Sequence, residues 1–136
     1  MKILVVEDES PIAEILQYAL TDAGYAVLGP VATADEGLRI AEKNRPDLAL
    51  VNINLKDGSK GTDLARELVN RWRVPCLFVS GEMVEAEKYQ DVALGYIAKP
   101  YKPSVVIESI EVAKAIIDGK PYQKRIPPDL KLFSDE

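Results

Sequence analysis

The amino-acid sequence predicts an α/β fold, a doubly wound sheet of five parallel strands with helices on both faces. Two observations support this fold class. Short apolar runs alternate with amphipathic stretches along residues 1–118, and three of the runs contain no polar residue. Strands of that kind are typical of parallel sheets that are buried on both faces. The alternating order favours right-handed crossovers between parallel neighbours.

The five predicted strands are the apolar runs themselves: Ile3–Val6, Ala26–Leu28, Leu48–Val51, Cys76–Val79 and Tyr96–Ala98. In doubly wound folds, ligands bind beyond the carboxyl ends of the strands, where the strand order reverses. The residues that directly follow each run are therefore the first candidates for function.

The stretches between the runs carry start and stop signals for helices. Ser10 is the predicted N-cap of the first helix, with Pro11 at the first helical position and Gly24 at the end. Thr33 and Glu36 form a predicted capping box for the second helix. The second helix is predicted to end before Pro46, and the other three span about Thr62–Trp72, about Met83–Val92, and Pro103 to the residue before Gly119.

The predicted fifth helix has more apolar surface than one buried face requires. The stripe predicted to face the sheet consists of Val106, Ile110, Ala113 and Ile117. A second apolar stripe consists of Val105, Val112 and Ile116. Two interpretations of this second stripe stay open: overlap into the core, or an exposed patch for a partner or a weak homodimer.

Composition and charge limit the possible classes of function. A chain of 136 residues fits one folded domain, and its net charge of −5 argues against a nucleic-acid binder, which needs a basic face. No apolar run approaches membrane-spanning length. The N-terminus shows no secretory signature, so a cytoplasmic location is expected.

The chain contains no histidine and a single cysteine, Cys76. The lack of histidine excludes His-based zinc sites and triads of the Ser-His-Asp type. No histidine is present to activate the Cys76 thiol, and the residue lies at the start of a predicted strand. We therefore interpret Cys76 as a buried core residue rather than as a reactive thiol.

Residues 119–136 break the alternating pattern and are predicted to form a C-terminal tail beside a domain of residues 1–118. Pro121, Pro127 and Pro128 favour an extended backbone. Leu130, Leu132 and Phe133 would allow the tail to dock on a surface. An untethered end is the preferred interpretation.

Acidic residues follow the first predicted strand as the run Glu7-Asp8-Glu9. Adjacent carboxylates repel each other, and a hard divalent cation such as Mg²⁺ resolves that repulsion through oxygen ligands. A solvated acidic turn that favours the dipole of the first helix is an equally open interpretation.

Polar residues also follow the later strands. Asn52 and Asn54 come after the third, Ser80 after the fourth and Lys99 after the fifth. A metal-binding acidic pair, a hydroxyl group and an ammonium group together suit a phosphoryl group, because the cations neutralise its oxygens while the hydroxyl donates a hydrogen bond. The combination at successive strand ends predicts a phosphoryl-receiving site.

These residues lie in motifs that carry a family resemblance. Over residues 1 to about 118, the chain resembles the receiver domain of two-component response regulators, and the matching pieces are ILVVEDE, PDLALVNINLKDG, CLFVSGE and GYIAKPY. The resemblance implies a flavodoxin-like (βα)5 fold with the strand order 2-1-3-4-5. It also implies no enzymatic activity beyond the signalling role of the family.

The resemblance further implies a role for each candidate residue. Glu7 and Asp8 would be the acidic pair, with Asp8 a direct Mg²⁺ ligand and the backbone carbonyl of Asn54 another. Ser80 would be the switch hydroxyl, Lys99 the phosphate-binding lysine and Tyr96 the switch aromatic. The two positions that tune dephosphorylation would be Asn54 and Glu82.

The sequence departs from the family at Asn52, where receivers carry the aspartate that accepts the phosphoryl group. An amide nitrogen is a poor nucleophile, so an acyl phosphate cannot form here. The Asn52 Oδ1 atom could still bind a metal, but with one charge fewer the affinity for Mg²⁺ should fall. Asp57 lies five residues further along and is no obvious substitute.

Two explanations of Asn52 stay open: a natural pseudo-receiver, or an engineered Asp→Asn change. Because Asp8, Ser80 and Lys99 are all retained, the engineered change is favoured. The expected function is that of a stand-alone receiver in a phosphorelay. It would meet a histidine kinase or histidine phosphotransfer protein near the first helix and act through protein–protein contact. A metal-dependent phosphotransferase or nuclease, and a flavin-binding protein, are weaker alternatives.

Overall fold

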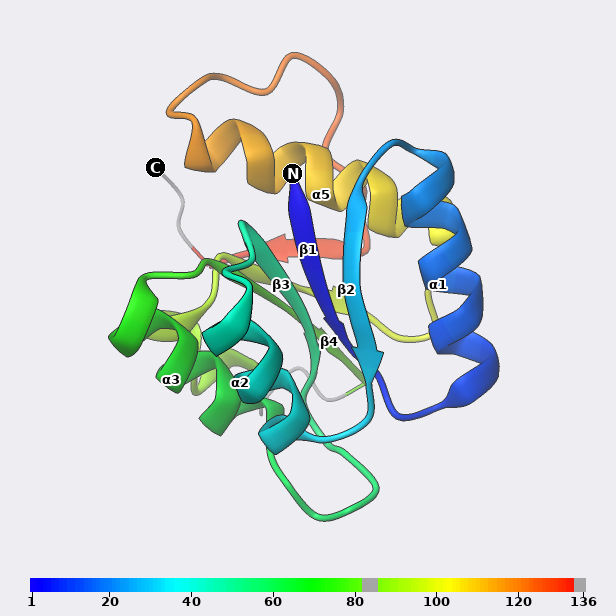
Figure 1. The fold of residues 1–136 in the computed structure, drawn as a ribbon. Helices are drawn as coiled ribbons and strands as arrows, with labels where there is room; N and C mark the ends of the chain where they lie inside the picture. The colour runs from blue at the N-terminus through cyan, green and yellow to red at the C-terminus, as the bar shows by residue number, and fades with distance from the viewer. Residues whose placement is uncertain (82–85, 134–136) are drawn as a thin grey trace.

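The computed structural model describes residues 1–81 and 86–133. Its centre is a six-stranded sheet in the order β2-β1-β3-β4-β5-β6 (Figure 1). The strands are β1 (Lys2–Val6), β2 (Ala26–Val31), β3 (Leu48–Asn52), β4 (Cys76–Ser80), β5 (Gly95–Ala98) and β6 (Leu130–Leu132). The first five pair in parallel in the predicted order, which confirms the predicted fold class.

Four α-helices in the described residues cover the two faces of this sheet: α1 (Ser10–Asp22), α2 (Ala34–Lys43), α3 (Gly61–Trp72) and α5 (Pro103–Ile117). α1 and α5 lie on one face, and α2 and α3 lie on the other (Figure 1). Successive residues of the inner strands point to opposite faces and are buried on both. This double burial explains why the three central runs contain no polar residue.

The structure tests the N-terminal caps predicted for α1 and α2, and the two predictions differ in their result. One half of the capping box is confirmed, because the backbone N–H of Glu36 donates to Thr33 Oγ1 at 3.1 Å and Thr33 precedes α2. In the other half, the Glu36 side chain accepts from the backbone N–H of Ala32, at 3.3 Å, instead of from that of Thr33. The prediction of Ser10 as N-cap is wrong. Ser10 is the first helical residue and Glu9 occupies the cap position without a side-chain hydrogen bond. Pro11 near the start of α1 fixes the local backbone without a polar cap.

The predicted fourth helix falls partly outside the described residues, because residues 82–85 are not among them. Its last part, Gln90–Val92, is a 3₁₀-helix (η1), so an α-helix running to Val92 is wrong. The second strand extends three residues beyond its predicted end, to Val31, and the fifth begins one residue earlier, at Gly95.

The preferred interpretation of residues 119–136 as an untethered end is wrong, because residues 130–132 form β6, which pairs antiparallel with β5. The Leu130 side chain is buried among residues of α5 and the sheet, and this burial of apolar surface stabilises the docked segment. Gly95 permits the close approach, because a Cβ there would overlap the backbone carbonyl of Lys131. The division of the chain at residue 118 stays a prediction.

The two stripes of α5 divide differently from the prediction. Val106, Ile110 and Ala113 are buried as expected, but Ile117 at the end of the helix is 41% exposed. Val112 of the second stripe is fully covered, and its apolar cluster includes Leu130. The second stripe therefore overlaps into the core at Val112. Only its last residue, Ile116, is strongly exposed.

Cys76 is a buried residue of β4, as predicted. Burial raises the pKa of its thiol to about 12, so the thiolate that would react is strongly disfavoured. Within the described ranges, no helix combines the length and apolar character needed to cross a membrane.

Candidate functional site

A cleft of about 350 Å³ opens at the carboxyl end of the sheet. The fold brings the strand ends together because β3, β4 and β5 pair in register, with Asn52 opposite Val79 and Ser80 opposite Ala98. The cleft is lined by Asp8, Glu9, Asn52, Asn54, Leu55, Lys56, Ser80, Gly81 and Lys99. The candidates from four different strand ends therefore share one cavity, as the topology predicts.

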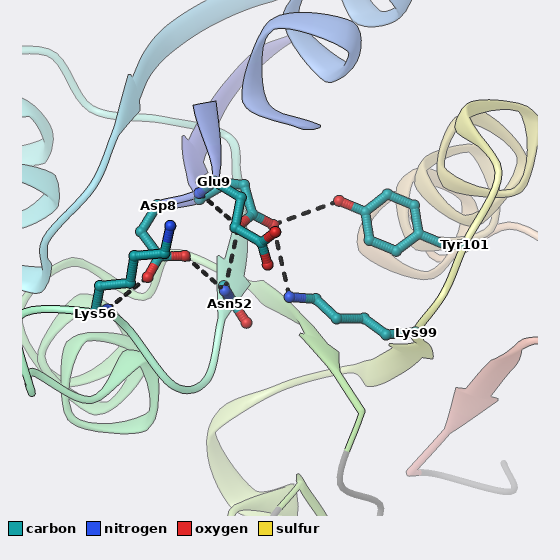
Figure 2. A network of polar contacts seen from close by, with 7 residues as sticks. Asp8, Glu9, Asn52, Lys56, Lys99 and Tyr101 are labelled. Carbon is teal, nitrogen blue, oxygen red and sulfur yellow. Dashed lines mark hydrogen bonds and ion pairs between the residues drawn. The ribbon is translucent and has the colours of Figure 1, made fainter. Parts of the chain in front are cut away.

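The Asn52 side chain lies at the centre of a polar network and is only 6% exposed (Figure 2). Its amide nitrogen donates to Glu7 Oε2 at 3.3 Å and to Asp8 Oδ1 at 3.2 Å. The two N–H bonds of one amide group thus hold the two carboxylates of the acidic pair. A carboxylate at this position would accept rather than donate, and it would repel both neighbours.

Glu7 is a buried carboxylate, only 4% exposed. Its Oε2 atom also accepts a hydrogen bond from the backbone N–H of Glu9 at 3.2 Å. The Lys99 ammonium lies 3.9 Å from Oε1, and the Tyr101 hydroxyl donates to the same oxygen at 3.5 Å. In Figure 2, Lys99 and Tyr101 lie on the same side of the network, across from Asp8 and Lys56.

Burial dominates the electrostatics of Glu7 and raises its pKa, although Lys99 and the Glu9 N–H act in the opposite direction. A carboxyl group whose folded pKa exceeds its unfolded value lowers stability as the pH rises above that unfolded value. The pKa of Tyr101 is also raised, first by burial and then by the negative charge of Glu7. The phenol therefore stays protonated and able to donate.

The Glu7→Gln variant is expected to be more stable than the native chain at pH 7 in EDTA, by about 1 kcal/mol. The gain should shrink as the pH falls toward 4.5, the ordinary pKa of a glutamate, because the native carboxyl group then takes up a proton. Thermal unfolding at several pH values measures the difference. A lower melting temperature for Glu7→Gln at pH 7 would show that the attraction of Lys99 outweighs the cost of burial.

Asp8 completes the network on the opposite side from Lys99. Its Oδ2 atom accepts a hydrogen bond from the backbone N–H of Lys56, while Oδ1 accepts from Asn52. Each of the four oxygens of Glu7 and Asp8 therefore has a donor or a cation of the protein nearby. The acidic pair is compensated by the chain itself.

The loop after β3 forms one wall of the cleft. Asn54 pairs with Lys60 through an isolated bridge, and the Lys60 ammonium donates to Asn54 Oδ1 at 2.8 Å. Asp57 is not among the residues that line the cleft, and it accepts hydrogen bonds from the backbone N–H and the hydroxyl of Ser59. These bonds lower the pKa of Asp57, with the Ser59 hydroxyl as the largest cause. The arrangement agrees with the view that Asp57 does not replace a carboxylate at position 52.

The predicted candidates separate into those at the cleft and those elsewhere. Asp8, Asn52, Asn54, Ser80 and Lys99 line the cleft, and Glu7 contacts it through the Asn52 amide. The Tyr96 ring packs instead against Phe133, and Glu82 lies outside the described residues. Sequence reasoning missed Tyr101 and Lys60, although Tyr101 directly follows Lys99-Pro100 in the motif GYIAKPY.

The residues at the cleft fit a hard divalent cation incompletely. Glu7 and Asp8 supply two carboxylates, and the carbonyl oxygens of Asn52 and Asn54 are suitable further ligands in type. The Asn52 amide, however, turns its nitrogen toward both carboxylates. Among the residues that the structure describes, no cluster of three or more Asp, Glu, His or Cys side chains is arranged to hold a metal.

The parallel sheet with its cleft at the carboxyl strand ends defines a flavodoxin-like domain of the CheY type. The chain belongs to the response regulator receiver domain family, whose pattern it matches over residues 3–111. Receiver domains are signalling modules of two-component systems. They typically bind Mg²⁺ at the acceptor site and interact with histidine kinases and downstream targets.

Two characterised relatives are longer than this chain. The phyllosphere-induced regulator PhyR of Methylorubrum extorquens is 35% identical over 116 residues, which are 82% of this chain and 43% of PhyR. The regulatory protein VanR of Enterococcus faecium is 30% identical over 113 residues, which are 81% of this chain and 48% of VanR. The chain therefore spans less than half the length of these relatives.

Solved structures of receiver domains share the fold. A CheY-like receiver domain protein from Methanospirillum hungatei superposes with a TM-score of 0.80 at 30% identity, covering 87% of this chain and 96% of that one. The receiver domain of NtrX from Brucella abortus gives a TM-score of 0.75 at 29% identity, covering 82% and 96%.

Proposed function

We propose that this chain is a receiver module of a phosphorelay whose acceptor position, Asn52, cannot be phosphorylated, and that its output is protein–protein contact. The observation that carries the proposal is the position of Asn52. It lies at the end of β3, in one cleft with Asp8, Ser80 and Lys99, and its amide donates to both acidic residues. The site keeps the groups that suit a phosphoryl group and lacks the nucleophile.

Mg²⁺ is the cofactor that this site would take, and Asn52 weakens its binding. The residues that would hold the ion are Glu7, Asp8, Asn52 and Asn54. Bound there, the ion would supply positive charge to neutralise phosphoryl oxygens. Two effects lower its affinity: the missing charge at position 52, and the hydrogen bonds that the Asn52 amide already makes with both carboxylates.

Lys99 and Ser80 are the residues that would contact the other phosphoryl oxygens. Lys99 would contribute its ammonium group from the end of β5, and Ser80 would contribute its hydroxyl from the end of β4. Tyr96, Asn54 and Glu82 keep the roles proposed for them by the family resemblance, as switch aromatic and as residues that tune dephosphorylation.

A histidine kinase or a histidine phosphotransfer protein is the proposed upstream partner, with docking near α1. The exposed side chains Ile15 and Tyr18, 54% and 76% exposed, give α1 an apolar surface for such contact. The helix starts beside the cleft, because Glu9 lines the cleft and precedes Ser10.

The decisive experiment offers acetyl phosphate and Mg²⁺ to the native chain and to the Asn52→Asp variant, and measures intact mass. We expect label on the variant only, because the new carboxylate oxygen can attack phosphorus while the acetate oxygen leaves with its electron pair. Addition of Lys99→Ala to the variant should reduce labelling at least tenfold, since the ammonium is lost. An unlabelled Asn52→Asp variant that is folded would refute the receiver chemistry.

A natural pseudo-receiver that works without phosphorylation is the second candidate. It is favoured by the donors of the chain itself, which compensate all four oxygens of Glu7 and Asp8 without a metal ion. Under this candidate, the Asn52→Asp change leaves binding of the downstream partner unaltered, with or without acetyl phosphate. Under the first candidate, binding responds to the phosphodonor in the variant and not in the native chain.

A further inference from the structure

The C-terminal strand contacts β5 close to the phosphate-binding lysine. The backbone N–H of Ala98 donates to the carbonyl of Asp129 at 3.0 Å, and Ala98 is the residue directly before Lys99. At the other end of the same pairing, the backbone N–H of Phe133 donates to the carbonyl of Leu94 at 3.0 Å. The segment 129–133 therefore bonds to the backbone of β5 at both ends of that strand.

A ring contact adds a second link between this segment and β5. The Phe133 ring lies with its centroid 5.8 Å from that of Tyr96, at an interplanar angle of 34°. Tyr96 is only 4% exposed, so Phe133 and the core enclose its ring. Aromatic pairs at this separation attract each other beyond the area they bury.

β4, the strand on the other side of β5, connects the same backbone to the cleft. Ala98 lies opposite Ser80 of β4, and the backbone N–H of Lys99 donates to the carbonyl of Ser80 at 2.9 Å. The Lys99 ammonium then reaches Glu7 Oε1 at 3.9 Å. One short stretch of backbone, residues 98–99, thus bonds to the C-terminal segment on one side and to the cleft on the other.

The attachment of the C-terminal segment is small. β6 contains three residues, of which Leu130 is buried, while Lys131 is exposed and Leu132 is half-buried. Segments with few buried contacts open at a lower free energy than the rest of a domain. A modest displacement at residues 98–99 can therefore change the population of the docked segment.

We propose that Phe133 and the strand β6 are a positioning element for Lys99, so that docking of the C-terminal segment and occupancy of the phosphoryl-receiving cleft are thermodynamically linked. The proposal rests on the proposed function. When a phosphoryl group binds in the cleft, the Lys99 ammonium leaves Glu7 and contacts the phosphoryl oxygens. The displacement of Lys99 then shifts the neighbouring residues of β5, Ala98 and Tyr96. Linkage of this kind is reciprocal, so loss of the Phe133 contact also changes the cleft.

The first test uses the native chain and needs no phosphorylation. NMR spectra of Phe133→Ala are compared with those of Lys131→Ala, a matched change of an exposed side chain in the same C-terminal segment. We expect Phe133→Ala to shift the Lys99 backbone amide and the Asn52 side-chain amide by several linewidths, and Phe133→Tyr to restore their native positions. Lys131→Ala should leave both signals in place. Unshifted cleft signals in a folded Phe133→Ala variant would overturn the proposal.

The second test uses hydrogen exchange on the Asn52→Asp variant, with Mg²⁺ alone and with Mg²⁺ and acetyl phosphate. The exchange rates of the Ala98 and Phe133 amides should change by about tenfold after labelling, which is a coupling of ordinary size. The native chain, treated identically, should show no change. If the variant is labelled and both amides keep their rates, the linkage is absent although the proposed function stands. If the variant is not labelled, the proposed function fails, and the NMR comparison alone decides whether Phe133 positions Lys99.

Discussion

Replacement of Gly61 by alanine is expected to destabilise the protein by about 3 kcal/mol, which lowers the melting temperature by roughly 10 °C. Gly61 is the first residue of α3, and its backbone N–H donates to the carbonyl of Ile53 at 2.7 Å. A Cβ at this position would overlap the backbone carbonyl of Asn52 and lie 2.6 Å from Val51 Cγ1. The helix must therefore move away from the end of β3.

The Gly61→Ala change should also disturb the cleft, because the Asn52 carbonyl that it displaces belongs to the residue at the centre of the polar network. Gly81→Ala is the matched control, since among the residues that the structure describes a Cβ there meets only Lys99 Cβ, at 3.9 Å. Urea unfolding of the native chain, Gly61→Ala and Gly81→Ala measures the difference in their free energies of unfolding. Equal midpoints for Gly61→Ala and Gly81→Ala would contradict the close approach of α3 to β3.

The Asn52→Asp variant is expected to be less stable than the native chain in EDTA, by about 2 kcal/mol. The change removes the two hydrogen bonds to Glu7 and Asp8 and places a third carboxylate beside them. Saturating Mg²⁺ should reverse the loss, because an ion present at a hundred times its dissociation constant adds about 2.7 kcal/mol. The native chain should gain much less stability from Mg²⁺, since its Asn52 amide already donates hydrogen bonds to Glu7 and Asp8.

Thermal unfolding of both proteins in EDTA and in Mg²⁺ measures this reversal. Asn70→Asp on the exposed side of α3 is the matched control, because it makes the same chemical change away from the cleft. The melting temperature of the control variant should match that of the native chain both in EDTA and in Mg²⁺. A native chain that gains as much stability from Mg²⁺ as Asn52→Asp would show that the Asn52 amide does not weaken metal binding.

The fold was predictable because its signals are local and repeated. The buried runs, together with the capping box of Thr33 and Glu36, determine strand and helix positions within a few residues. The strand order came from the family resemblance rather than from the pattern. The cleft followed from topology, since parallel strands end at one edge and carry Asn52, Ser80 and Lys99 there.

The sequence could not reveal interactions that depend on tertiary contact. β6 is three residues long and pairs with a strand more than thirty residues earlier in the chain. The prolines that favoured an extended tail lie directly before it, at positions 121, 127 and 128. The hydrogen bond of Tyr101 to Glu7 joins residues 94 positions apart. The direction of the Asn52 amide depends on both carboxylates at once, which no spacing rule contains.

The sixth strand has a consequence for the behaviour of the protein in solution. Without residues 130–132, β5 would present a row of unpaired N–H and C=O groups at the border of the sheet, and such borders template association and fibre formation. Gly95 would add a flat stretch of bare backbone to that border. In the intact chain, β6 covers this border, and its exposed Lys131 places a charge on the new outer strand, where charge discourages further pairing. A recombinant fragment cut at residue 118 would lose this protection against aggregation.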